Sequence, residues 1–187
     1  SQAAVPYTVE FDRNNTNAGI WVRQDNVAFD LDGHTNTMIS LLYAADQASQ
    51  TGTLHVAGGG LLAPTHTYLA SAVGSEGTLV VRGANTQLTT ATVLLGRKNN
   101  SLGVFRIEDG ARADVTSLYP GRDGTGVGRV IVSNATIAAS YFRLGYVATA
   151  RGEMLLTGPD TRWLNIGSPE AMVGYVGQGE LTVEKGA

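Results

Sequence analysis

The chain has 187 residues, of which 43% are apolar, 16% are charged and 24 are glycine; this length suits one domain and requires no second. The composition excludes a disordered chain and an ordinary helical protein, and it favours strands joined by tight turns. A formal net charge of -3 offers no basic field for nucleic acid, and the absence of cysteine excludes disulfides, thiol catalysis and Cys-bound zinc.

Residues 1–51 contain short strand-like runs without a clean repeat. Tyr7–Phe11, Ile20–Val22 and Val27–Leu31 are bounded alternating segments, which is the signature of strands. Met38–Ala48 has a periodicity that fits a strand and a short helix equally well. We expect this part to form about two irregular N-terminal rungs of the same structure as the rest of the chain.

From residue 52 onward, a glycine followed by alternating apolar residues recurs six times, at spacings of 25, 26, 25, 24 and 27 residues. Two and four positions after each glycine every residue is apolar, whereas the position next to the glycine is mixed. This period of two predicts strands with one face in a core. The repeating glycines are Gly52, Gly77, Gly103, Gly128, Gly152 and Gly179.

Each repeat adds a second and a third short apolar stretch, such as Leu61–Leu62 and Tyr68–Leu69 in the first copy. Two or three strands per repeat are therefore predicted. The third stretch runs into a glycine that would supply the positive φ of a tight corner. These corner glycines are Gly74, Gly96, Gly121, Gly145 and Gly174.

A unit of two or three strands buries its apolar face only by stacking on identical units. The predicted fold is all-β, a single-stranded right-handed parallel β-helix with about 25 residues per rung, the hand following the usual rule for parallel crossovers. Propellers and leucine-rich repeats have other periods, and an antiparallel sandwich has no reason to keep one. The repeats fill 52–187, and the last stops after its first strand, so we expect a longer parent protein.

The segment Val173–Ala187 reads V-G-x-x-x-x-G-x-L-x-V-x-x-G-A, and the segment Leu144–Gly158 is similar to it. This run resembles the passenger repeats of bacterial autotransporters, the proteins of type V secretion. It returns with drift in Leu95–Ala111, and Val27–His34 resembles the opening coil of such passengers.

The resemblance implies a β-helical adhesin on the bacterial cell surface or released from it, with a role in cell adhesion and virulence. It also implies export through a C-terminal outer-membrane β-barrel in the same longer chain. The repeat motif is structural, so the resemblance implies no catalytic residue, metal or cofactor and no enzymatic activity. The expected partners are a host extracellular-matrix or cell-surface protein, a glycan, or further copies of the chain.

Four side chains are the candidate binding residues. Arg97 and Arg122 occupy the same corner loop one repeat apart, and Tyr146 and Tyr175 take the same place on later rungs. Arginine and tyrosine are favoured at binding hot spots, so this column is a predicted contact surface for a glycan or a host protein. The alternative interpretation is a plain solvated edge.

The alternative function is a polysaccharide-binding or polysaccharide-degrading β-helix. Asp30, Asp32 and His34 alternate along one predicted strand, a spacing suited to acid and base work or to a divalent cation. The competing interpretation is a solvated strand end with an Asp-Gly turn. An enzyme of this class should have several acidic residues on adjacent rungs, whereas a stalk should have none.

One outward column of the repeat also contains bulky apolar residues between polar neighbours. An exposed apolar strip marks a partner surface, although it can equally be covered by other parts of the parent protein. The column consists of His55, Val80, Arg106, Ile131, Leu155 and Thr182.

Overall fold

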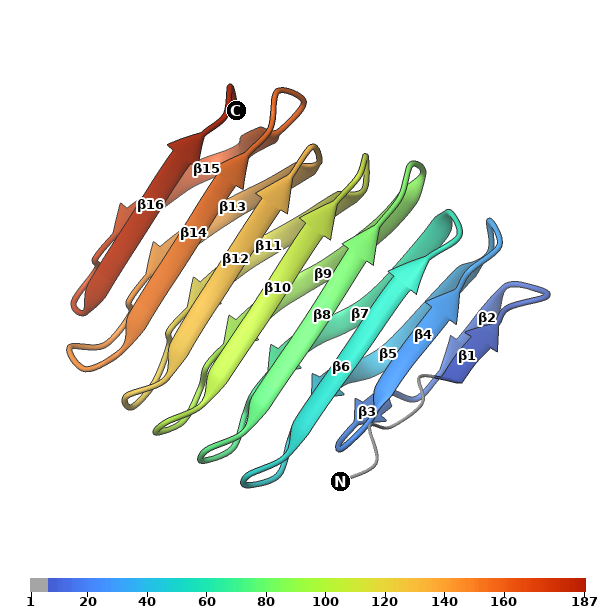
Figure 1. Cartoon of the computed structure of the whole chain (residues 1–187), viewed down its shortest axis with the longest axis horizontal. Helices are drawn as coiled ribbons and strands as arrows, with labels where there is room; N and C mark the ends of the chain where they lie inside the picture. Colours follow the sequence, from blue (N-terminus) through green and yellow to red (C-terminus); the bar gives the residue numbers. More distant parts are fainter. Residues whose placement is uncertain (1–6) are drawn as a thin grey trace.

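The computed structural model describes residues 7–187, with the backbone alone for 167–169. All of its regular elements are strands, which form two facing sheets (Figure 1). Sheet A contains β1 (Tyr7–Glu10), β4 (Asn26–Asp30), β6 (Thr51–Ala57), β8 (Glu76–Arg82), β10 (Leu102–Glu108), β12 (Val127–Ser133), β14 (Arg151–Thr157) and β16 (Gln178–Glu184). Sheet B contains β2 (Asn15–Asn17), β3 (Ile20–Val22), β5 (Thr35–Ala44), β7 (Gly60–Leu69), β9 (Thr86–Leu95), β11 (Arg112–Pro120), β13 (Thr136–Leu144) and β15 (Arg162–Val173).

Every strand pair in both sheets is parallel, and the chain alternates between the sheets as it advances along the stack. The repeating glycines are partners in register from β6 to β16, so one sequence repeat corresponds to one turn. The coil contains about seven turns and is right-handed (Figure 1). The predicted parallel β-helix is confirmed.

The strands of sheet B bend near their middle. In β7, Leu62 and Pro64 are buried before the bend and Thr67 and Leu69 after it, so two consecutive residues face outward between them. The register shifts at the same place in the β5–β7 pair and in the β13–β15 pair. The second and third apolar stretches of each repeat are thus the two halves of one bent strand.

Apolar side chains from both sheets fill the interior along the whole axis. The two columns predicted to face a core are buried from β6 to β14, with Phe105 and Ile107 fully enclosed in the middle turn. On β16, Leu181 is only partly buried and Val183 is 55% exposed, because no further strand packs beyond β16.

Two different constraints select the two sets of glycines. The corner glycine Gly96 has a φ of 62°, and the other four predicted corner glycines also have positive φ. The repeating glycine Gly103 instead lies against the preceding corner, where a Cβ atom would come 2.5 Å from Gly96 N and 2.6 Å from Leu69 O. The repeating glycine is required by a close approach of backbone to backbone.

The strands before residue 51 belong to the same two sheets as the regular repeats. β1 pairs with β4 in sheet A, and β2 and β3 both pair with β5 in sheet B. The ambiguous segment Met38–Ala48 is a strand up to Ala44, where the chain leaves sheet B. Within residues 7–187, no helix has the length and hydropathy needed to cross a membrane.

Candidate functional site

Aromatic and arginine side chains line the outer face of sheet B where its strands end and the chain turns back to sheet A. Trp21, Tyr43 and Tyr68 are successive partners in register on β3, β5 and β7. On later turns, the same line is joined by the residue directly after four of the corner glycines, which are Gly96, Gly121, Gly145 and Gly174. We call this line the aromatic–arginine ridge; its members are Trp21, Tyr43, Tyr68, Arg97, Tyr119, Arg122, Arg143, Tyr146 and Tyr175.

In the N-terminal half of the ridge the rings contact one another from rung to rung. The ring centroids of Trp21 and Tyr43 are 6.2 Å apart in a stacked arrangement, and those of Tyr43 and Tyr68 are 5.2 Å apart edge to face. The Arg97 guanidinium lies 5.6 Å from the centroid of the Tyr68 ring. These distances are typical of favourable aromatic and cation–π contacts.

The C-terminal half repeats the arrangement with more arginine. Tyr146 lies between two rings, with its centroid 5.7 Å from that of Tyr119 and 5.2 Å from that of Tyr175. Arg143 lies over the ring of Tyr175 at 4.7 Å, and Arg122 lies over that of Tyr119 at 5.8 Å. The four candidate binding residues therefore belong to one continuous surface.

Acidic side chains accompany the arginines of the ridge. Arg143 donates to Glu170 at 2.6 Å, and this hydrogen bond raises the pKa of Arg143 above its ordinary value. Arg97 and Arg122 share Asp123, with nitrogen–oxygen distances of 3.5 and 3.9 Å. The last two contacts are too long for strong hydrogen bonds, so these guanidinium groups keep donors for a partner.

Neighbouring rings or guanidinium groups lie against most ridge rings. Tyr175 is 42% exposed and the side chain of Arg122 is 39% exposed. Burial raises the pKa of Tyr43 above its ordinary value. A tyrosine hydroxyl both donates and accepts hydrogen bonds. The ridge is suited to contact with a partner surface through aromatic rings, hydroxyls and guanidinium donors.

The second predicted group, Asp30, Asp32 and His34, lies at a corner and not along one strand. β4 ends at Asp30, whose Oδ1 accepts a hydrogen bond from Asp32 N at 3.2 Å. Asp32 has a φ of 45° and is followed by Gly33 at 78°, so the chain turns between the two acids and His34. The expectation that the three side chains share one strand face is wrong, because the Asp-Gly turn separates them.

Other acidic residues do meet this corner. Glu10 is the register partner of Asp30, and Glu10, Asp12, Asp30 and Asp32 line one surface pocket of about 340 Å³. Arg13 donates to Asp12 at 3.0 Å and holds the pKa of that carboxyl below its ordinary value. Within residues 7–187, no three His, Asp or Glu side chains are placed to hold a metal ion.

The outward column of sheet A that contains bulky apolar residues is not an exposed strip. Val80 is only 6% exposed, and Ile131 and Leu155 are partly buried. Flanking ion pairs cover the column, including one between Arg129 and Glu153 at 2.6 Å. At its C-terminal end the column lines a small surface pocket of about 340 Å³, in which Ile131, Leu155 and Thr182 are flanked by charged side chains.

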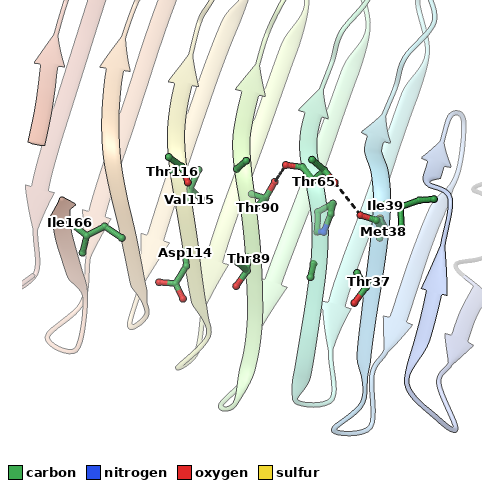
Figure 2. Close-up of a pocket in the computed structure, with 13 residues that line it drawn as sticks. Thr37, Met38, Ile39, Thr65, Thr89, Thr90, Asp114, Val115, Thr116 and Ile166 are labelled. Carbon is green, nitrogen blue, oxygen red and sulfur yellow. Dashed lines mark hydrogen bonds between the residues drawn. The ribbon is translucent and has the colours of Figure 1, made fainter. Parts of the chain in front are cut away.

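A shallow groove of about 530 Å³ runs along the outer face of sheet B at the bend (Figure 2). It crosses β5, β7, β9 and β11, and Ile166 of β15 borders it at the C-terminal end. We call it the bend groove. Its outward lining residues are Thr37, Ile39, Ala63, Thr65, Thr89, Ala91, Asp114, Thr116 and Ile166.

Threonine hydroxyls bridge the turns in the bend groove. Thr65 Oγ1 donates to the carbonyl oxygen of Met38, and Thr90 Oγ1 donates to that of Thr65, both at 3.3 Å (Figure 2). These bonds satisfy carbonyl groups where the bend interrupts the ladder. The bend is thus a fixed feature of the structure.

Comparisons with known proteins give no relative for this chain. No family model matches it, and no curated protein and no solved structure matches it. The resemblance to autotransporter passengers stays a prediction from the motif.

Sequence reasoning found the ridge only in part. It named Arg97, Arg122, Tyr146 and Tyr175 because they follow corner glycines. It assigned the aromatic residues at the ends of the sheet B strands to apolar stretches instead. The missed members are Trp21, Tyr43, Tyr68, Tyr119 and Arg143. Their signal was the repeat itself, since an aromatic residue or arginine recurs one position before the last strand residue in several turns.

Proposed function

We propose that this chain is a segment of the surface-exposed passenger of a bacterial autotransporter adhesin, acting as a rigid β-helical stalk with a host-binding surface. The observation that carries the proposal is the uninterrupted, in-register stack from β4 to β16 in sheet A. Hydrogen bonds between neighbouring strands run along the axis of such a stack, so the rod resists bending and stretching. The passenger-like motif in Val173–Ala187 supports the autotransporter assignment.

The aromatic–arginine ridge supports the adhesive part of the proposal. It extends along the rod from Trp21 to Tyr175, so a partner would make the same kind of contact on several turns at once. Tyr, Trp and Arg supply most of the binding energy at protein interfaces. We expect a matrix protein, a cell-surface protein or a glycan as the partner, and self-association of the rod by the same surface.

Location at the cell surface is part of the same proposal. A chain without cysteine crosses an oxidising compartment unfolded without forming wrong disulfides, which suits export before folding. The proposed action is binding without catalysis, since the residues of the repeat motif serve packing and turns.

The direct test is binding of the 187-residue chain to immobilised matrix proteins and glycans. The variant Arg122→Ala/Tyr175→Ala removes two exposed ridge side chains, and Tyr141→Ala is the matched control because Tyr141 is a 38% exposed tyrosine outside the ridge. We expect saturable binding that the double variant weakens and the control retains. Absence of binding to every surface would contradict the adhesive function.

A second candidate function has one specific observation in its favour. The four carboxylates at the β1 and β4 corner come from adjacent turns, as a polysaccharide-degrading β-helix requires. Release of reducing sugar from a plant or bacterial polysaccharide, abolished by Asp30→Asn and Asp32→Asn, would favour this enzyme. We propose the adhesin because these four carboxylates are exposed, whereas the acid of such an enzyme needs an apolar environment that keeps it protonated.

A further inference from the structure

The outward residues of the bend groove form rows that run from turn to turn, with threonine on alternate turns. Thr37 is the register partner of Ala63, and Thr89 is the partner of Asp114. Neighbouring strands are ~4.8 Å apart, so a ligand lying along the axis meets a threonine of the same row at every second turn, or about 9.6 Å.

This interval distinguishes two extended polymers. An extended peptide repeats its side-chain direction every two residues, or ~6.6 to 6.8 Å, and falls out of step with the turns. Successive sugars of an extended β-1,4-linked glycan are turned over relative to each other, and each advances by about one strand spacing, so alternate sugars reach alternate turns in the same position. The spacing favours the glycan.

The lining has the mixed chemistry that a sugar chain needs. Hydroxyl groups such as those of Thr89 and Thr116 both donate and accept, as sugar hydroxyls do. The methyl groups of the groove fit the apolar C–H faces of sugar rings. Ile39 at one end is 71% exposed and Ile166 at the other is 43% exposed, so each offers an apolar surface to a chain that enters or leaves the groove.

The groove has no net charge to attract a polyanion. Asp114 is the one charged side chain among its described lining residues, and Arg112 donates to both of its oxygens at 2.7 to 3.0 Å. The pair neutralises itself and leaves carboxylate lone pairs that accept from sugar hydroxyls.

We infer that the bend groove binds an uncharged, extended β-1,4-linked polysaccharide lying along the solenoid axis across β5, β7, β9 and β11. The inference rests on the proposed adhesive function and names a ligand class for it. It assigns to the rod a second contact surface on sheet B, separate from the aromatic–arginine ridge.

Calorimetric titration of the whole 187-residue chain with cellohexaose, xylohexaose and mannohexaose tests the inference. We expect saturable binding of at least one of these neutral probes. Thr89→Trp fills the groove and should weaken that binding by about tenfold or more. Thr51→Trp is the matched control, because Thr51 is an equally exposed strand threonine on sheet A, and it should bind as the parent chain does.

Circular dichroism shows whether each variant is folded, and Asp114→Asn provides a milder change at the same groove that should also weaken binding. Absence of binding for all three sugars, or binding that neither groove variant weakens, would overturn the inference. Preference for an oligogalacturonate or for an extended peptide would do the same. If the chain attaches to matrix proteins but binds none of the sugars, only the sugar-binding role of the bend groove is overturned. If it binds neither matrix proteins nor sugars, the adhesive function is overturned as well.

Discussion

Replacing Gly103 by alanine would place a Cβ atom inside a backbone hydrogen bond of the corner. Gly96 N donates to Leu69 O at 3.0 Å, and the new Cβ would lie 2.5 Å from that nitrogen and 2.6 Å from that oxygen. Losing this bond costs about 1 kcal/mol, and displacing packed backbone costs about 1–3 kcal/mol more. We therefore expect Gly103→Ala to lower the free energy of unfolding by about 2–4 kcal/mol.

Urea unfolding followed by far-ultraviolet circular dichroism measures this change. Gly33→Ala is the matched control, because Gly33 has a φ of 78° but a Cβ there would meet no atom within 4 Å. Its cost is only that of a left-handed alanine, about 1–2 kcal/mol. If Gly103→Ala were no more destabilising than Gly33→Ala, close backbone approach would not be the reason for the repeating glycine.

Three further predictions concern the core, the pH response and the ridge. Phe105→Ala removes a ring with no exposed surface and should lower the free energy of unfolding by about 3–5 kcal/mol, against less than about 1 kcal/mol for the exposed Tyr141→Ala, both measured by urea unfolding. In the folded protein, burial and, after it, the charge of Arg82 lower the pKa of His55 from its ordinary 6.5. The histidine therefore binds a proton more readily in the unfolded chain than in the folded one. The melting temperature should therefore fall as pH drops below 6.5, and His55→Gln should remove that part of the fall in a comparison of pH 7.5 with pH 5. Arg143→Gln breaks the ion pair with Glu170 and should lower the free energy of unfolding by about 1 kcal/mol. Thermal melting of both proteins at low and high salt should show that this difference shrinks as the ionic strength rises.

The regular part of the fold was predictable from the sequence. The repeating glycine and the two apolar columns fix the period, the strand faces and the register, and the structure pairs Gly103 with its equivalents on both sides. The bend was not predictable, because the change of phase between Pro64 and Thr67 looks like the boundary of two strands. The reason for the repeating glycine was also hidden, since the atoms that exclude a side chain there belong to the preceding corner.

The candidate surfaces were predictable only where they follow the corner signal. Arg97 and Tyr175 are recognised by their place after a glycine, whereas Tyr43 and Tyr68 lie on strands, where aromatic residues are equally expected in a core. The acidic corner was predicted only in part: Asp30 and Asp32 were named, but Glu10 was missed because it is separated from Asp30 by 20 residues, outside the regular period. The bend groove depends on the bend and gave no signal in the sequence.

An in-register, rigid rod is the claim on which both proposed binding surfaces depend, and the absence of cysteine allows a clean distance measurement across it. Thr53 and Glu180 occupy equivalent outward positions five turns apart in sheet A. Spin labels are attached to the variant Thr53→Cys/Glu180→Cys, and the distance between them is measured by pulsed electron paramagnetic resonance. We expect one narrow distribution near ~24 Å, which is five strand spacings, after correction for the length of the labels. A broad distribution, or one centred far from that value, would contradict the rod.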